Sequence, residues 1–353
     1  MIFLDANAFY SYFGRGSLGM TSSPVDEVAL KHYLDGRDDK SLPTSVFIEV
    51  VTHFRNDSAR LKNILRFREE KGLRLYNNIP DYVVDPDELT CVHYMNEQEL
   101  SGYAERILKK KIEIESKFTL LFYEITRDLY AYYKLENTDK LSQENKDSVL
   151  SYIGRDVYRQ YSSSVEQDLV NELTKGYDKN KEQKVLKDFY IKQLNEACLF
   201  IDILISGAEA CKDENSDIIK SIQDTYQNQV NQGMDGENGT MPCIVDTLST
   251  DTNFLEGAKS RIAKMLKKGK YTDTQTSYLR NVMFTAWFDR AQKLKKNDIF
   301  DMFYVGCLDC KGSNSNRCIL VDTSSYLITF DGALKSFIGT VKSSNLQFIE
   351  SIK

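Results

Sequence analysis

The sequence predicts an α/β fold with a parallel sheet that is flanked by helices and interrupted by a long all-α insertion. Short apolar runs typical of buried strands lie near both ends of the 353-residue chain, at residues 2–4 and 326–329. Helical periodicities accompany these runs, which is the alternation expected of an α/β domain. The middle of the chain, by contrast, carries apolar residues at helical spacing.

The first segment is expected to alternate strands and helices. Residues 2–4 have no polar face, as expected of a strand buried on both sides. Residues 26–34 and 61–67 have apolar positions spaced for helices, and Pro43 marks the start of another helix. Residues 73–76 suggest a second strand.

A long helix is predicted from about residue 98 onward. Apolar residues recur there at steps of three and four over more than thirty residues, which corresponds to a helix about 50 Å long. The segments 150–161 and 191–205 repeat the spacing, so residues 98–210 are expected to form a helical hairpin or bundle. Long helices with apolar seams favour self-association, and we expect a homodimer or a partner protein to use this region.

The chain is therefore divided into one α/β domain and an insertion. Residues 1–94 and 285–353 are expected to form the α/β domain, and residues 95–284 the helical insertion. Near the C-terminal end, helical spacing over 278–288 precedes expected strands at 318–321 and 346–349, in addition to the run at 326–329.

Charge and composition limit the partners. The formal net charge is −6, so a nucleic acid would be repelled on average and held only by metal ions and local basic patches, such as Lys293, Lys295 and Lys296. No leader segment and no apolar run near the roughly 20 residues of a membrane span is evident. We therefore expect no membrane association and a cytoplasmic location.

Cysteine and histidine chemistry is weakly indicated. Seven cysteines, an odd number, suggest reduced thiols rather than a disulfide framework. Cys307, Cys310 and Cys318 have the spacing of zinc ligands without an obvious fourth, and ordinary buried cysteines are the alternative. The chain has only three histidines, none in a recognisable catalytic triad.

Acidic residues are the candidate functional groups. Asp5 and Asp331 each follow an expected strand, and function collects at the carboxyl ends of parallel strands. Either aspartate could instead cap the following helix. Glu49 lies in an apolar helical stretch, where it must pair, bind a metal or point outward. Asp298 and Asp301 share a helix face, or reflect the preference for acidic residues at a helix N-terminus.

Carboxylates gathered at one point would repel each other unless a cation lies between them. A set of acids without histidine suits Mg²⁺ or Mn²⁺, because these ions prefer hard oxygen ligands. Such ions activate a bound water and stabilise charge on a phosphate. The chemistry indicated is phosphodiester hydrolysis.

Four motifs together resemble those of the PIN-like nucleases. These are Asp5-Ala-Asn7, the segment 44–49 of a Thr-led helix that carries Glu49, the acidic segment 297–301, and Thr329-Phe-Asp331. The resemblance implies that the catalytic metal ligands are Asp5, Glu49, Asp301 and Asp331, with Asp298 as an additional or substitute ligand. It also implies that Asn7 and Thr329 are polar groups supporting these ligands.

The expected function is that of a metal-dependent nuclease, an endoribonuclease by the family resemblance, in which the insertion selects or regulates. Two alternatives stay open. The chain could be a catalytically degenerate PIN-like protein that binds or regulates through its insertion, or a structure-specific DNA nuclease.

Overall fold

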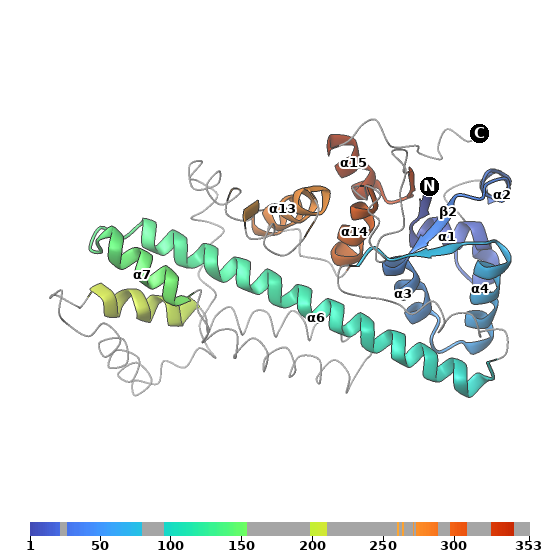
Figure 1. Ribbon diagram of the computed structural model, residues 1–353, viewed down its shortest axis with the longest axis horizontal. Helices are drawn as coiled ribbons and strands as arrows, with labels where there is room; N and C mark the ends of the chain where they lie inside the picture. The colour runs from blue at the N-terminus through green and yellow to red at the C-terminus, as the bar shows by residue number, and fades with distance from the viewer. Residues whose placement is uncertain are drawn as a thin grey trace, which may run out of the picture. The chain divides into compact units, whose positions relative to one another are not determined.

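The computed structural model describes residues 1–21, 27–79, 95–153, 198–209, 260, 263–264, 271, 273–288, 297–308 and 326–341 (Figure 1). The chain divides into two compact units. Unit 1 comprises Met1–Lys111 and Leu266–Lys353, and unit 2 comprises Ile112–Met265. The long helix α6, Glu97–Glu136, contributes residues to both units, so the division falls within a helix.

Unit 1 contains a four-stranded parallel sheet in the order β3-β2-β1-β4. Its central strand β1, Ile2–Leu4, pairs with β2, Lys40–Pro43, and with β4, Tyr326–Ile328. The edge strand β3, Arg74–Tyr76, pairs with β2. All three residues of β1 are fully buried. The predicted α/β class with a parallel sheet is confirmed.

Strand β2 was missing from the sequence prediction. Its sequence Lys-Ser-Leu-Pro offers no apolar run, yet all four residues are buried. The Lys40 ammonium is accommodated because it donates a hydrogen bond to the carbonyl oxygen of Arg37 at 2.7 Å. The pairing of β2 with β1 on one side and β3 on the other therefore outweighs the weak local strand preference of this segment.

Helices surround the sheet and agree with the expected segments where these are described. Helix α1 packs against α2 and α3, and α14 packs against α3 and α13. The remaining bounds in unit 1 are α1 Ala6–Phe13, η1 Arg15–Leu18, α2 Glu27–Asp35, α3 Thr44–His53, α4 Ser58–Glu70, α13 Asp273–Phe288, α14 Asn297–Val305, η3 Gly306–Leu308 and α15 Gly332–Val341. The expected strands at 318–321 and 346–349 lie outside the described residues.

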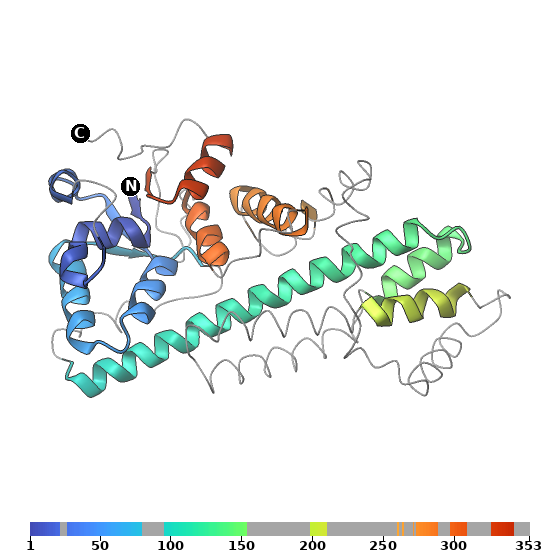
Figure 2. The same cartoon turned by 180° about the vertical axis from the view of Figure 1, so that it is seen from behind.

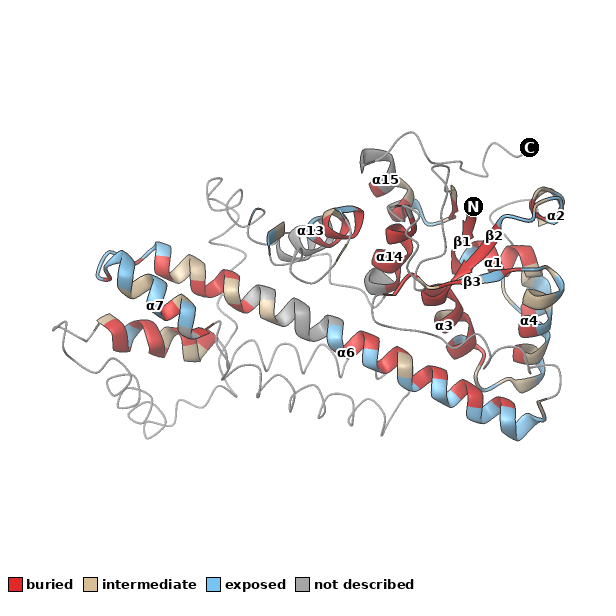
Figure 3. Cartoon of the chain, in the orientation of Figure 1, coloured by how far each residue is buried: buried red, intermediate tan, exposed pale blue. Residues whose placement is uncertain are grey.

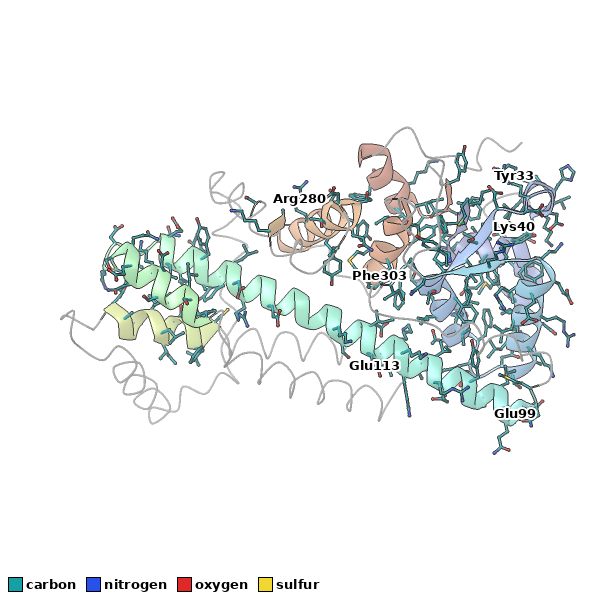
Figure 4. The ribbon with its side chains drawn as sticks, viewed as in Figure 1. Tyr33, Lys40, Glu99, Glu113, Arg280 and Phe303 are labelled. Carbon is teal, nitrogen blue, oxygen red and sulfur yellow. The ribbon has the colours of Figure 1, made fainter. Side chains whose placement is uncertain are left out.

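Buried polar side chains fix α14 relative to the sheet. The Tyr304 hydroxyl donates to the carbonyl oxygens of Phe3 and Ile328, at 3.0 and 3.1 Å. The Asn78 amide, just after β3, donates to the carbonyl oxygen of Phe303 and to Ser45 Oγ, each at 2.8 Å. Figure 4 labels Phe303 on α14. One helix is thus tied to residues from β1, β4 and the end of β3.

Gly306 allows α13 to approach the end of α14 closely. A Cβ atom at this position would lie 2.8 Å from Cδ and 3.0 Å from Cγ of Gln275, and still closer to its Nε2. Gln275 is itself buried, so its side chain has little room to move. Any larger residue at this position would require the Gln275 side chain or one of the two helices to shift.

The described part of unit 2 is helical. Helix α6 is 40 residues long, about 60 Å, and confirms the predicted long helix (Figure 2). It is followed by α7, Gln143–Ile153, and the helical segment 198–209. Asp202 accepts hydrogen bonds from Tyr130 and pairs with Lys134 at 3.0 Å, which joins this segment to α6.

Burial along α6 follows the expected period. Leu100, Tyr103, Ala104 and Ile107 are almost completely buried, whereas the residues between them are largely exposed (Figure 3). No helix in the described ranges is long and apolar enough to cross a membrane.

Candidate functional site

Asp5 stands at the carboxyl end of the central strand β1 and begins α1. Its Oδ1 accepts the backbone N–H of Ala8 at 2.6 Å, so it caps the helix, and its own N–H donates to the carbonyl oxygen of Ile328. The side chain is only 8% exposed. Burial, and then the charge of Asp331, raise the pKa of Asp5 to about 6, although hydrogen bonds from Thr329, Ala8 and Phe330 oppose this rise.

Asp331 follows the adjacent strand β4 and is joined to Asp5 through Thr329. The Thr329 hydroxyl donates to the Asp5 carboxylate and accepts the backbone N–H of Asp331 at 3.1 Å. Asp331 Oδ1 accepts the N–H of Leu334 at 2.9 Å, so this aspartate also caps a helix, α15. The two aspartates at the ends of neighbouring parallel strands therefore form one hydrogen-bonded unit with Thr329.

Capping was the alternative explanation for both aspartates, and both do cap helices. This local role leaves metal binding open, because each carboxylate has two oxygens and about four acceptor sites. A cap alone needs no burial: Asp57 caps α4 through Arg60 N at 2.9 Å while its side chain is 42% exposed. Asp5 differs from Asp57 because it is buried beside a second acid.

Glu49 lies on α3, half-buried between two completely buried residues. The charge of Glu49 influences the same hydroxyl group, that of Tyr10, as the charge of Asp5 does. The pKa of Tyr10 is raised by burial and by the charges of Glu49 and Asp5, while the charge of Arg15 lowers it. The Tyr10 hydroxyl therefore lies within electrostatic range of both carboxylates.

Asp301 lies half-buried on α14, one turn before Tyr304. Burial raises the pKa of Tyr304, and the charges of Asp5 and Asp301 raise it further. The Tyr278 hydroxyl on α13 donates to Asp301 Oδ2 at 3.5 Å. Tyr304 thus lies within range of Asp5 and Asp301, as Tyr10 does of Asp5 and Glu49. The side chain of Asp298 lies outside the described part of the chain.

The remaining predicted residues are placed as follows. Asn7 is exposed on α1, and its Oδ1 accepts Arg15 Nη2 at 2.7 Å, so it supports an arginine rather than a carboxylate. Lys293, Lys295 and Lys296 lie outside the described residues, as do Cys310 and Cys318. Cys307 is buried next to the carbonyl oxygen of Phe303.

Sequence reasoning did not find the groups that surround these acids. Tyr10, Asn78 and Tyr304 contact or are influenced by residues distant along the chain, whereas Arg15 contacts the nearby Asn7 and Ser11. The only sequence signal is polar atoms among apolar neighbours, since a buried hydroxyl or amide needs a partner.

We expect replacement of Tyr304 by Phe to lower the free energy of unfolding by about 1–3 kcal/mol, because two buried carbonyl oxygens lose a shared donor. Urea denaturation would measure the change. Tyr326→Phe, which removes a half-exposed hydroxyl from β4, is the control and should be nearly neutral. Equal midpoints for the two variants would show that the Tyr304 hydroxyl does not hold α14 in place.

No family model, curated protein or solved structure matches this chain.

The carboxylates suit a hard divalent cation, with a smaller ligand set than the resemblance implies. Within the residues described, no group of three or more Asp, Glu, His or Cys side chains is arranged to hold a metal ion. Mg²⁺, however, is usually held by one or two carboxylates and completes its shell with water and substrate phosphate oxygens. Asp5 and Asp331 fit that requirement, and a cation would offset the cost of ionising the buried Asp5.

Proposed function

We propose that this protein is a metal-dependent nuclease with a PIN-like fold, and that it cuts RNA in preference to DNA with Mg²⁺ or Mn²⁺. The observation that supports the proposal is the pair Asp5 and Asp331, which Thr329 joins at the carboxyl ends of two neighbouring parallel strands. The preference for RNA comes from the family resemblance alone.

In this mechanism Asp5 and Asp331 hold the cation, and Thr329 keeps their spacing. A bound Mg²⁺ or Mn²⁺ supplies an activated water and charge neutralisation for the phosphate. Glu49 on α3 and Asp301 on α14, whose charges influence the same tyrosines as the charge of Asp5, are the groups available to accept a proton or orient the water. The resemblance adds Asp298 as a further ligand from the start of α14.

Cleavage assays test the proposal directly. The wild-type protein should cut single-stranded RNA when Mn²⁺ or Mg²⁺ is present and lose this activity in EDTA. Single-stranded DNA and branched DNA duplexes, assayed in parallel, separate a ribonuclease from a structure-specific DNA nuclease. Asp331→Asn should reduce the rate of cleavage by on the order of a thousandfold, because one of the two carboxylates that hold the cation is lost.

A matched control is Asp57→Asn, which changes another helix-capping aspartate of unit 1 and should leave cleavage unchanged. Full activity of Asp331→Asn would refute the proposed centre.

The absence of a three-residue ligand group in the described ranges favours a second candidate, a degenerate PIN-like protein that binds or regulates through its helical insertion. Metal titration distinguishes the two. A ligand that binds only the folded state stabilises it by about 3 kcal/mol at a concentration a hundred times its dissociation constant. The nuclease should show a higher melting temperature in Mn²⁺, and the degenerate protein should not.

A further inference from the structure

Arg15 has an unusual set of contacts for an arginine near an acidic site. Its Nη2 donates to Asn7 Oδ1 at 2.7 Å and its Nε donates to Ser11 Oγ at 3.3 Å. Both acceptors are neutral. Glu27 accepts the backbone N–H of Arg15 at 3.0 Å, and among the described residues no ion pair joins a carboxylate to the guanidinium.

Several other arginines of the described chain are paired with a carboxylate. Arg37 pairs with Asp39 at 3.1 Å, Arg60 with Asp57 at 3.4 Å, Arg68 with Glu69 at 3.5 Å and Arg127 with Asp128 at 2.7 Å. Arg15 is therefore held in place, and no carboxylate in the described part of the chain neutralises its charge. A guanidinium fixed in this way keeps its positive charge available to an anion.

The contacts of the Arg15 side chain also orient its guanidinium toward the end of α1 where Asp5 lies. Arg15 follows the C-terminal end of α1, whereas Asp5 begins that helix. Asn7 and Ser11 are four residues apart and share one face of α1, and Arg15 begins η1 just after that helix ends. Because Nη2 reaches Asn7, two residues after Asp5, the side chain folds back along α1 toward the start of the helix.

The Tyr10 hydroxyl gives an independent indication of this placement. Besides burial, the charges that shift its pKa are those of Glu49, Arg15 and Asp5. Arg15 therefore lies in the same electrostatic neighbourhood as two of the candidate catalytic acids. Its guanidinium is also accessible, since the contact with Asn7 is exposed.

We propose that Arg15, held by Asn7 and Ser11, binds a backbone phosphate of the nucleic-acid strand beside the acidic site; this inference rests on the proposed nuclease function. A protein of net charge −6 needs such local positive groups to hold a polyanion. A planar guanidinium with free donors is suited to phosphate oxygens, and the acids and their cation then act on the phosphodiester close by.

The test separates binding from cleavage. A labelled single-stranded RNA is titrated by fluorescence anisotropy against Asp5→Asn protein, which should bind without cutting, at salt concentrations from about 50 to about 200 mM. Adding Arg15→Gln should weaken binding about tenfold or more at low salt, because one charge-assisted hydrogen bond is lost. It should also reduce the slope of log affinity against log salt by about 0.7, the value for one phosphate contact of a single strand.

Two further variants complete the design. Arg15→Lys keeps the charge but not the planar fork, and should retain the salt slope with only part of the affinity. Arg37→Gln removes one positive charge before the amino-terminal end of β2, where Figure 4 labels its neighbours Tyr33 and Lys40, and should leave the slope unchanged. Thermal melting of each variant checks the fold.

Equal affinity and equal slope for Arg15→Gln and Arg37→Gln would overturn the inference without affecting the nuclease proposal. The nuclease proposal fails separately, if wild-type protein shows no metal-dependent cleavage of any of the substrates.

Discussion

Replacing Asp5 by Asn is expected to abolish metal-dependent cleavage, by on the order of a thousandfold, and at the same time to stabilise the metal-free protein. Both effects have the same origin. The carboxylate is buried beside Asp331, so its charge is costly in the absence of a cation. Asparagine keeps the helix cap to Ala8 without that charge, because Asn and Asp are equally good caps.

The size and pH dependence of this stabilisation follow from the pKa of Asp5. Burial raises it from 3.8 to about 6, so the folded protein binds more protons than the unfolded chain between these values. Wild-type stability should therefore decrease as the pH rises from about 4 to about 6, by roughly 3 kcal/mol in total. Asp5→Asn should lose this decrease and be the more stable protein at neutral pH.

Urea denaturation in EDTA, at several pH values, would measure the difference. Asp57→Asn serves as the control, since it changes an exposed capping aspartate and should alter stability by less than about 1 kcal/mol. If Asp5→Asn were less stable than the wild type at neutral pH without metal, the charge of the Asp5 carboxylate would not destabilise the folded state, which would contradict the prediction. Addition of Mn²⁺ should stabilise the wild type but not Asp5→Asn.

Replacing Gly306 by Ala is expected to destabilise unit 1 by about 3 kcal/mol and to reduce activity. The added Cβ would overlap Gln275 on α13, and overpacking of a buried contact usually costs about 1–3 kcal/mol. Relief of the overlap requires the buried Gln275 side chain, α13 or α14 to shift, and α14 carries Asp301. Denaturation and cleavage assays on the same preparation would report both effects.

Two further variants make this prediction specific. Gly102→Ala, on an exposed position of α6 with no atom within 4 Å of the new Cβ, should stabilise the protein by about 0.5–1 kcal/mol. Gln275→Ala combined with Gly306→Ala should recover part of the loss, because the smaller side chain removes the overlap. Independent, additive effects of the two substitutions would contradict the proposed contact.

The sequence was informative where local pattern and tertiary structure agree. Periodicity predicted α6 and the helices of unit 1, and the uninterrupted apolar run predicted β1. Strand β2 was not predicted, because its polar residues become buried only when the strand pairs with a neighbour on each side, and local sequence patterns do not report such pairing. Lys40 in particular depends on a carbonyl oxygen that folding brings near.

The site shows the same division. Asp5 and Asp331 could be selected because both follow strands, and strand ends are a general location for function. Their connection through Thr329, and the approach of α14 through Tyr304, depend on contacts between residues hundreds of positions apart. Such contacts carry no sequence period, so Tyr10 and Tyr304 could be identified only once the chain was folded.

The pairing of β1 with β4 has a consequence for how the protein is made. The first strand from the ribosome has its partner on one side 38 residues later, where Ile2 pairs with Lys40, but its partner on the other side only at Tyr326. During synthesis a growing chain therefore has Asp5 without Asp331, and α14 without one of the two carbonyl oxygens that receive Tyr304. Under the proposed nuclease function, an unfinished polypeptide would not cut the message being translated, because the proposed centre forms only after β4 has emerged.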